Sequence, residues 1–393
     1  MSALNKPLDS INESDLRALI TNAVPESKTI EYKEALPGNS DSEKKEFLAD
    51  ASSFANAVGG DLIFGIKEES GVATELSGLQ ISDPDAEINR LESSVRDGIQ
   101  PRITGLSSRA IPFASGAYAV ILRIRKSWTS PHMVTYKGHS RFYSRTSTGK
   151  YPLDVTELRA AFTMSETAIE RIRNFRIDRL GKVASGETPV PLENNAKIVL
   201  HLIPVDAFDP STRYDISSVA KDLTKLYPIY SSSIFDNRYN FDGYLTYSQF
   251  PNSSSAHSYL QIFRNGIIEA VEAYMIRQTG DDCLIGSLAF EKELINALPR
   301  LLEIQKRLGV EPPDFVMLGL LGVRGYSMAV DSSRFPFAAA HPIDRDALIL
   351  PEIMLDTLEC DASQILKPIF DSVWNATGWP RSMSYDENGK WRG

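Results

Sequence analysis

Residues 101–150 contain nine basic side chains and no carboxylate, so this stretch has the chemistry to bind phosphate. A local positive field attracts anions whatever the total charge of the chain is. Near its end the stretch interleaves cations with an aromatic ring, a combination that pairs with phosphates and stacks on bases. The residues that we expect to contact nucleic acid are Arg123, Arg125, Arg141, Tyr143, Arg145 and Lys150, and the cations among them should line one positive surface.

The rest of the composition is that of an ordinary globular protein. The chain has 393 residues, of which 42% are hydrophobic and 24% charged, as in typical soluble domains. Its net charge of −9 argues against a uniformly basic nucleic-acid binder. Cys283 and Cys360 form no CxxC pair and suggest no disulfide framework. We therefore expect a cytoplasmic protein. We also expect no membrane association, because no apolar run approaches the ~18–20 residues of a membrane helix and the first residues lack a signal-peptide core.

The elements that must position the basic residues follow from the hydrophobic pattern. Residues 29–33 alternate in the manner of a strand, which places Ile30 and Tyr32 on one face and Glu31 and Lys33 on the other. Further strands are expected at 61–66, 118–125 and 141–144, and we predict that all four strands share one sheet.

A helix is expected over residues 42–57, where apolar residues recur at helical spacing. We predict that this helix packs on the sheet and buries Phe47, Ala51 and Phe54. Gly59 and Gly60 follow it, and two glycines permit a sharp turn and a close approach of another chain segment.

The second half of the sequence predicts a separate α+β domain. Apolar strand patterns occur in AKIVLHLIPV, FDGYLTYSQF and FVMLGLLGV, with a long helical pattern over residues 284–308. Gly, Pro and polar residues cluster between the two halves. We therefore divide the chain into a first domain over 1–182, a linker over 183–195 and a C-terminal domain over 196–393.

Three stretches of the first half, taken together, resemble the AlbA-type domain of Schlafen proteins and their bacterial relatives. Residues 26–33, ESKTIEYK, are similar to that family's E-x4-E-[FY]-K strand. Residues 53–66, SFANAVGGDLIFGI, resemble its helix–GG–strand signature. Residues 141–162, RFYSRTSTGKYPLDVTELRAAF, resemble its aromatic–Arg–turn–helix ending. The resemblance covers roughly residues 10–165 and implies an α+β fold with a mixed sheet, nucleic-acid binding and a role in bacterial defence.

The resemblance also implies a metal site. In Schlafen nucleases three carboxylates hold a divalent metal, and the matching positions here are Glu26, Glu31 and Glu69, with Glu68 as the competitor for the third place. Carboxylate oxygens suit Mg²⁺ or Mn²⁺. Such an ion lowers the pKa of a bound water and neutralises a phosphoryl transition state. Lys33 would contact the scissile phosphate. The alternative is structural, with Glu31 and Lys33 forming an exposed pair of little energetic value.

The spacing of Glu26 and Glu31 sets a geometric condition on this site. The two residues are five apart, so in one unbroken strand their side chains would face opposite sides of the sheet. A turn or bulge must therefore lie between them, and we place it at Ser27–Lys28.

Two principal functions remain open on the sequence. The first is a nucleic-acid-binding protein that acts as a divalent-metal-dependent endoribonuclease on structured RNA such as tRNA. The second is a non-catalytic DNA-binding or regulatory protein whose C-terminal domain senses a partner or ligand. A third reading, assembly on an acidic partner chain, and self-association into a homo-oligomer are also open. No Walker-type nucleotide site is expected, because Thr148-Gly149-Lys150 lacks the earlier glycine of a P-loop and Tyr151 replaces its Ser/Thr.

Overall fold

The computed structural model describes residues 4, 6–209, 212–280, 282–330 and 341–393. The chain divides into two compact units, Met1–Thr167 and Ala168–Gly393. Helix α4 (Val155–Ser185) begins in the first unit and ends in the second. The division therefore lies before the segment 183–195 that the composition favoured, because the second part of α4 buries Leu180 and Val183 among strands of the second unit.

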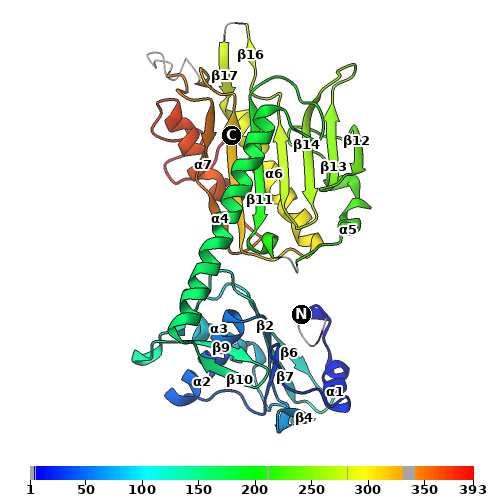
Figure 1. Ribbon diagram of the computed structural model, residues 1–393, viewed down its shortest axis with the longest axis vertical. Helices are drawn as coiled ribbons and strands as arrows, with labels where there is room; N and C mark the ends of the chain where they lie inside the picture. The colour runs from blue at the N-terminus through cyan, green and yellow to red at the C-terminus, as the bar shows by residue number, and fades with distance from the viewer. Residues whose placement is uncertain (1–3, 5, 210–211, 281, 331–340) are drawn as a thin grey trace. The chain divides into compact units, whose positions relative to one another are not determined.

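A four-stranded mixed sheet forms the centre of the first unit (Figure 1). Its order is β1 (Ile30–Lys33), β2 (Gly59–Phe64), β7 (Tyr118–Arg125) and β6 (Leu106–Pro112). Strand β1 runs parallel to β2, and the other neighbours are antiparallel. The α+β class and three of the four strands expected in this sheet are thus confirmed.

The placement of residues 141–144 in that sheet is wrong. They belong to β9 (Arg141–Thr146), which lies in a second four-stranded sheet with β10 (Gly149–Pro152), β8 (Met133–Val134) and β5 (Ile99–Gln100). The physical reason is local, because Ser147 and Thr148 alone separate β9 from β10 and the two strands pair as a hairpin.

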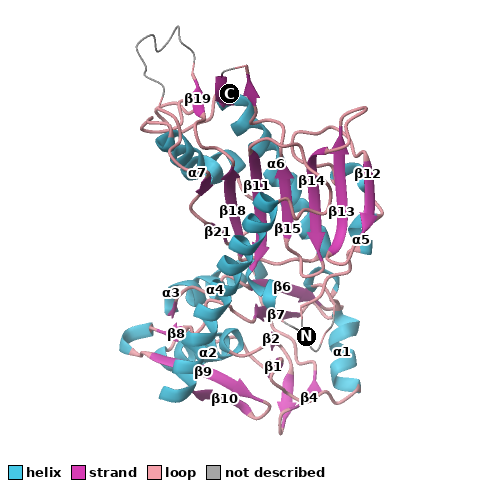
Figure 2. Cartoon of the chain, turned by 45° about the horizontal axis from the view of Figure 1, so that its top comes forward, coloured by secondary structure: helices cyan, strands magenta, loops and turns pink. Residues whose placement is uncertain are grey.

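Helix α2 (Asp41–Asn56) packs against strands of both sheets, which Figure 2 shows beside β9. All nine residues from Phe47 to Ala55 are buried, and Phe47, Ala51 and Phe54 join Leu62 and Leu122 in one core. The predicted burial of these three residues is therefore confirmed. At the end of the helix, the side chain of Asn56 bonds the backbone of His132 and Tyr143 and so fixes the second sheet to α2.

The opposite face of the central sheet has its own core. Ile30, Tyr32 and Ile63 are buried there against Leu16 and Leu19 of α1 (Glu13–Thr21). Glu31 and Lys33 point to the α2 side, where both contact side chains of the charged residues described below. The division of strand β1 into an apolar and a charged face is thus as predicted.

The first unit is completed by short elements on the chain between these strands. They are η1 (Leu8–Ser10), the hairpin of β3 (Lys67–Glu69) and β4 (Val72–Glu75), α3 (Pro84–Gly98) and η2 (Tyr136–Gly138).

A large sheet, visible in Figures 1 and 2, lies at the centre of the second unit. It contains eight strands. Seven strands follow one another in the order β12 (Asp236–Tyr239), β13 (Gly243–Gln249), β14 (Ala256–Phe263), β15 (Ile268–Glu272), β11 (Lys197–Pro204), β18 (Asp314–Leu321) and β20 (Ala347–Ile349), and β21 (Ile353–Leu355) also pairs with β18. The sheet confirms the three strands that the sequence predicted most strongly.

Helices cover both faces of this sheet. Helices α6 (Ser287–Leu308) and α7 (Ala362–Ala376) bury one face, and the second part of α4 packs on the other. The remaining elements are η3 (Val205–Phe208), α5 (Ser217–Ala220), η4 (Leu223–Lys225), β16 (Gln278–Thr279), β17 (Asp282–Gly286) and β19 (Ser327–Ala329). None of the helices in the described ranges combines the length and the apolar character that a membrane crossing requires.

Replacing Gly60 by Ala should destabilise the first unit. A Cβ atom there would lie 2.5 Å from the carbonyl oxygen of Thr29 and 2.6 Å from Cε1 of Phe54. Because the backbone next to β1 cannot move away easily, we expect the free energy of unfolding to fall by about 1–3 kcal/mol. The loss should appear as a lower thermal unfolding midpoint. Gly181→Ala is the control. It meets no atom within 4 Å in α4 and should leave stability equal or higher. Equal midpoints for Gly60→Ala and the wild type would contradict this account.

Candidate functional site

A tight turn separates Glu26 from Glu31, as expected if two residues that are five apart are to lie on one side of the sheet. The N–H of Ser27 donates to the carbonyl oxygen of Ile30 at 3.0 Å. After this turn β1 begins, with its Thr29 and Lys33 carbonyl groups accepting hydrogen bonds from the β2 side. The chain therefore changes direction between the two acids.

Glu26 lies at the outer edge of β1, the edge not paired with β2. Its Oε1 accepts the N–H of Tyr32 at 2.9 Å, and the side chain is half-buried. Burial raises the pKa of Glu26, the Tyr32 N–H opposes this, and the charges of Glu31 and Glu68 raise it further. These carboxylates are thus close enough to act on one another.

Of the two candidates for the third acid, Glu68 lies beside Glu26. Gly71 connects them, since its carbonyl accepts the N–H of Glu26 at 2.6 Å and its own N–H donates to Oε2 of Glu68 at 2.5 Å. Glu69 has a side chain that is 68% exposed and lies 3.6 Å from Nζ of Lys67. The structure therefore favours the competitor, Glu68, over Glu69 for this place.

Glu31 is enclosed by cations. The residue is 7% exposed, and its Oε2 lies 2.5 Å from Nη2 of Arg145 while its Oε1 lies 2.6 Å from Nζ of Lys33. Arg145 is itself 3% exposed, with its guanidinium 3.6 Å from the centre of the Phe54 ring. Burial raises the pKa of Glu31, but the two cations outweigh it and hold the pKa below its ordinary value.

Asp50 is a second buried carboxylate, which sequence reasoning missed. It is 1% exposed, on α2, and its Oδ1 lies 2.6 Å from Nζ of Lys150 while its Oδ2 lies 3.9 Å from Nζ of Lys33. Burial and the charge of Glu31 raise the pKa of Asp50 to about 7, against Lys150 and Lys33. The signal available in the sequence was one acid inside an otherwise apolar helical run, since a buried charge needs a partner.

We call Glu31, Lys33, Asp50, Arg145 and Lys150 the charge cluster. Its members come from β1, α2, β9 and β10, so the cluster joins both sheets of the first unit through the helix between them. Lys150 also pairs with Glu46 at the surface.

The charge cluster does not fit a divalent metal ion. Both oxygens of Glu31 already contact cations, and three cations face two carboxylates in the cluster. Over the ranges that the structure describes, no three His, Cys, Asp or Glu side chains converge to hold a metal. We therefore assign no step to Mg²⁺ or Mn²⁺ at Glu26, Glu31 and Glu69.

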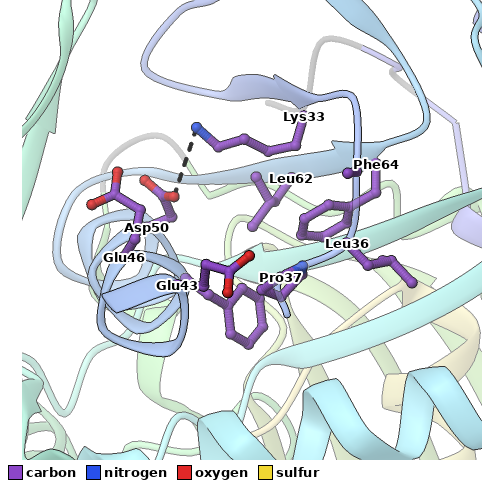
Figure 3. Close-up of a pocket in the computed structure, with 10 residues that line it drawn as sticks. Lys33, Leu36, Pro37, Glu43, Glu46, Asp50, Leu62 and Phe64 are labelled. Atoms are coloured by element: carbon purple, nitrogen blue, oxygen red, sulfur yellow. Dashed lines mark ion pairs between the residues drawn. The ribbon is translucent and has the colours of Figure 1, made fainter. Parts of the chain in front are cut away.

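A cavity of about 220 Å³ opens next to the charge cluster (Figure 3). Its apolar wall comes from Leu36, Pro37, Phe47, Leu62 and Phe64, and its polar side carries Lys33, Asp50, Glu43 and Glu46. Apolar walls with a few convergent polar groups are the usual make-up of a small ligand site. The polar side is mainly acidic, which does not suit a phosphate.

The six residues predicted to contact nucleic acid do not share one exposed surface. Arg145 and Lys150 are held in the charge cluster. Arg123 bonds both oxygens of the fully buried Asp61 at 2.7 and 3.0 Å, because the two residues are direct cross-strand partners. Arg125 is half-buried at the end of β7. Of these six residues, Arg141 alone is exposed, and none of the ion pairs among the described residues includes it.

Arg141 belongs to a smaller group that we call the basic patch, formed by Lys45, His139, Arg141 and Tyr143. The rings of His139 and Tyr143 are stacked with centres 6.0 Å apart, and Nε2 of His139 lies 2.8 Å from the Tyr143 hydroxyl. Partial burial, then the charges of Lys45 and Arg141, lower the pKa of His139. The charges of Lys45 on α2 and Arg141 on β9 thus reach His139 of this aromatic pair. Cations near aromatic rings suit the binding of phosphates and bases.

Comparison with known proteins assigns the class of the first unit. Residues 26–154 match the model of the family described as Schlafen, AlbA_2. The first unit therefore contains a Schlafen AlbA_2-type domain, and this family suggests a nucleic-acid-binding function. No curated protein matched the chain.

The solved structures that match this chain include one of low overall similarity. The DIP2311 protein from Corynebacterium diphtheriae is 16% identical, with a TM-score of 0.25. The alignment covers 35% of this chain and 26% of that one, so this chain matches about a quarter of the length of that protein.

Replacing Arg145 by Met should strongly destabilise the first unit, because it leaves Glu31 buried beside Lys33 alone. Removing one partner of a buried pair costs about 3–5 kcal/mol. Adding Glu31→Gln to Arg145→Met should restore part of the loss in a double-mutant cycle measured by chemical unfolding. Lys137→Met is the control, since it breaks an exposed pair with Asp41 and a long contact with the Tyr136 ring and should change little. Additive losses in the cycle would show that Arg145 and Glu31 act independently.

Proposed function

We propose that the first unit binds nucleic acid, RNA or DNA, through the basic patch. Lys45 and Arg141 contact phosphates, and the stacked His139 and Tyr143 rings support a neighbouring base or sugar. Phosphate contacts of this kind position the strand without selecting its sequence.

One observation carries this proposal. Arg141 is exposed, forms no ion pair within the described ranges, and lies with Lys45 close enough to His139 to lower its pKa. Three other cations of the predicted surface are held by carboxylates inside the unit, Arg123 by Asp61, Arg145 by Glu31 and Lys150 by Asp50.

The variant Lys45→Ala with Arg141→Ala should bind single-stranded and duplex nucleic acids more weakly, to a similar extent for all sequences. Each lost phosphate contact reduces the salt dependence, so the log–log slope of affinity against salt should flatten by roughly 1.5. Fluorescence anisotropy over a salt series measures both quantities.

Arg96→Ala is the matched control, because Arg96 is an exposed arginine on α3 and takes no part in the contacts between His139 and Tyr143. It should retain the wild-type slope. If the double variant keeps wild-type affinity and slope, the binding surface lies elsewhere on the chain.

We propose endoribonuclease activity on structured RNA such as tRNA as a second candidate function of the first unit. Its support is the position of Glu68 beside Glu26, since the backbone of Gly71 hydrogen-bonds to both residues. Cleavage of tRNA with and without Mn²⁺ tests it, with Glu26→Gln expected to lose cleavage and Glu69→Gln to keep it.

Glu26→Gln and Glu69→Gln remove the same charge at different positions, so Glu69→Gln is the matched control. Cleavage that persists in Glu26→Gln, or an absence of cleavage in the wild type under both conditions, would leave nucleic-acid binding without catalysis. That outcome would favour the alternative of a non-catalytic DNA-binding or regulatory protein. The anisotropy measurements with duplex DNA test its binding activity.

A further inference from the structure

The second unit contains a group of buried oxygen atoms at one end of its large sheet. Strand β11 ends at Pro204, which pairs with Asp314 at the start of β18, and Figure 2 shows the two strands side by side. Asp206 follows on η3, Asn265 lies in the turn between β14 and β15, and Gln305 lies on α6. Four elements therefore bring polar side chains to this end.

Five oxygen atoms of these side chains are buried and lack a hydrogen-bond donor within the described structure. They are both carboxylate oxygens of Asp314, Oδ1 of Asp206, Oδ1 of Asn265 and Oε1 of Gln305. Asp314 and Gln305 are completely buried. Buried polar atoms in native proteins are almost always paired, so a group of acceptors without donors requires an explanation.

The orientation of the two amides is fixed by their nitrogen atoms. Nδ2 of Asn265 donates to the carbonyl of Ala207 at 3.0 Å, and Nε2 of Gln305 donates to the carbonyl of Gly266 at 3.2 Å. Turning either amide over would lose these bonds. Their oxygens are therefore the atoms left for another partner.

Several contacts show that the group converges. The Tyr214 hydroxyl donates to Oδ2 of Asp206 at 3.1 Å, and the Tyr214 ring lies against Gly266. Gln305 lies next to Asp314, and the charges of both Asp206 and Asp314 reach Tyr214. The acceptors thus surround one region beside Tyr214.

Two carboxyl groups, those of Asp206 and Asp314, share this region. An unpaired buried carboxylate costs several kcal/mol in general. A positive ligand would remove this cost.

We propose that Asp206, Asn265, Gln305 and Asp314 bind one hard divalent cation of the Ca²⁺ class. Carboxylate and amide oxygens are ligands that Ca²⁺ accepts in flexible arrangements, whereas Mg²⁺ keeps several of its waters and transition metals prefer nitrogen or sulfur. Asp206 and Asn265 are only half-buried and provide the side from which an ion enters.

The bound ion would connect the end of β11, the start of β18, the β14–β15 turn and α6. The site would therefore act on the stability of the second unit, and its detection does not depend on nucleic-acid binding by the first unit.

Thermal unfolding of the full chain, stripped with EDTA and titrated with Ca²⁺ alone, tests the proposal. At a hundredfold excess over the dissociation constant, the midpoint of the second unit should rise by about 5–10 °C. Calorimetric titration should give one ion per chain.

Asp314→Asn keeps the shape of the side chain, removes the charge and supplies an N–H to the neighbouring acceptors. Without Ca²⁺ its midpoint should equal or exceed that of the stripped wild type, and Ca²⁺ should not raise it. Asp242→Asn, at an exposed acid of the same unit, should respond to Ca²⁺ as the wild type does.

Asp206→Asn, which should weaken Ca²⁺ binding at least tenfold, replaces Asp314→Asn in the test if that variant does not fold. A wild-type midpoint that Ca²⁺ leaves unchanged, or an equal rise in the Asp variants of the site, would overturn the proposal.

Discussion

The burial of two carboxylates, Glu31 and Asp50, is the constraint on which the first unit depends. Each lies in a core that also contains aromatic rings, and neither could remain charged there without cations. Strands β9 and β10 deliver those cations, Arg145 and Lys150. The second sheet is therefore held to the first by charge as well as by the apolar contacts of α2. The cost is that much of the basic stretch faces inward, which leaves a small outer patch for phosphate.

The second unit shows two outcomes for buried acids. Glu269 is fully buried, yet Arg179 and His201 contact its oxygens at 2.7 and 2.9 Å. Burial raises the pKa of Glu269, and these partners outweigh it and bring the pKa to about 2. Asp314 is equally buried and has no such donors among the described residues. The same sheet thus pairs one buried acid with two protein partners and leaves the other without a comparable partner, and the proposed cation site rests on this contrast.

The sequence predicted the elements better than their long-range partners. Alternation along residues 29–33 and helical spacing over 42–57 identify buried faces, because these periods are local properties of the backbone. The sheet to which residues 141–144 belong depends on a hairpin and on Asn56, 87 residues away from Tyr143. The common basic surface failed for a similar reason, since the acids that hold Arg123 and Arg145 are 62 and 114 residues distant. Counting cations does not reveal which of them a distant carboxylate will bury.

The hydrogen bond between Glu26 and Tyr32 has a consequence for association between molecules. Strand β1 is the edge of its sheet, and an edge strand with free N–H groups is a template for pairing with another chain. The Glu26 carboxylate occupies one of these donors and places a negative charge beside a strand whose Ile30 and Tyr32 are strongly apolar. One half-buried side chain thereby protects the protein against edge-to-edge aggregation, and this protection weakens in acid as the carboxylate takes up a proton.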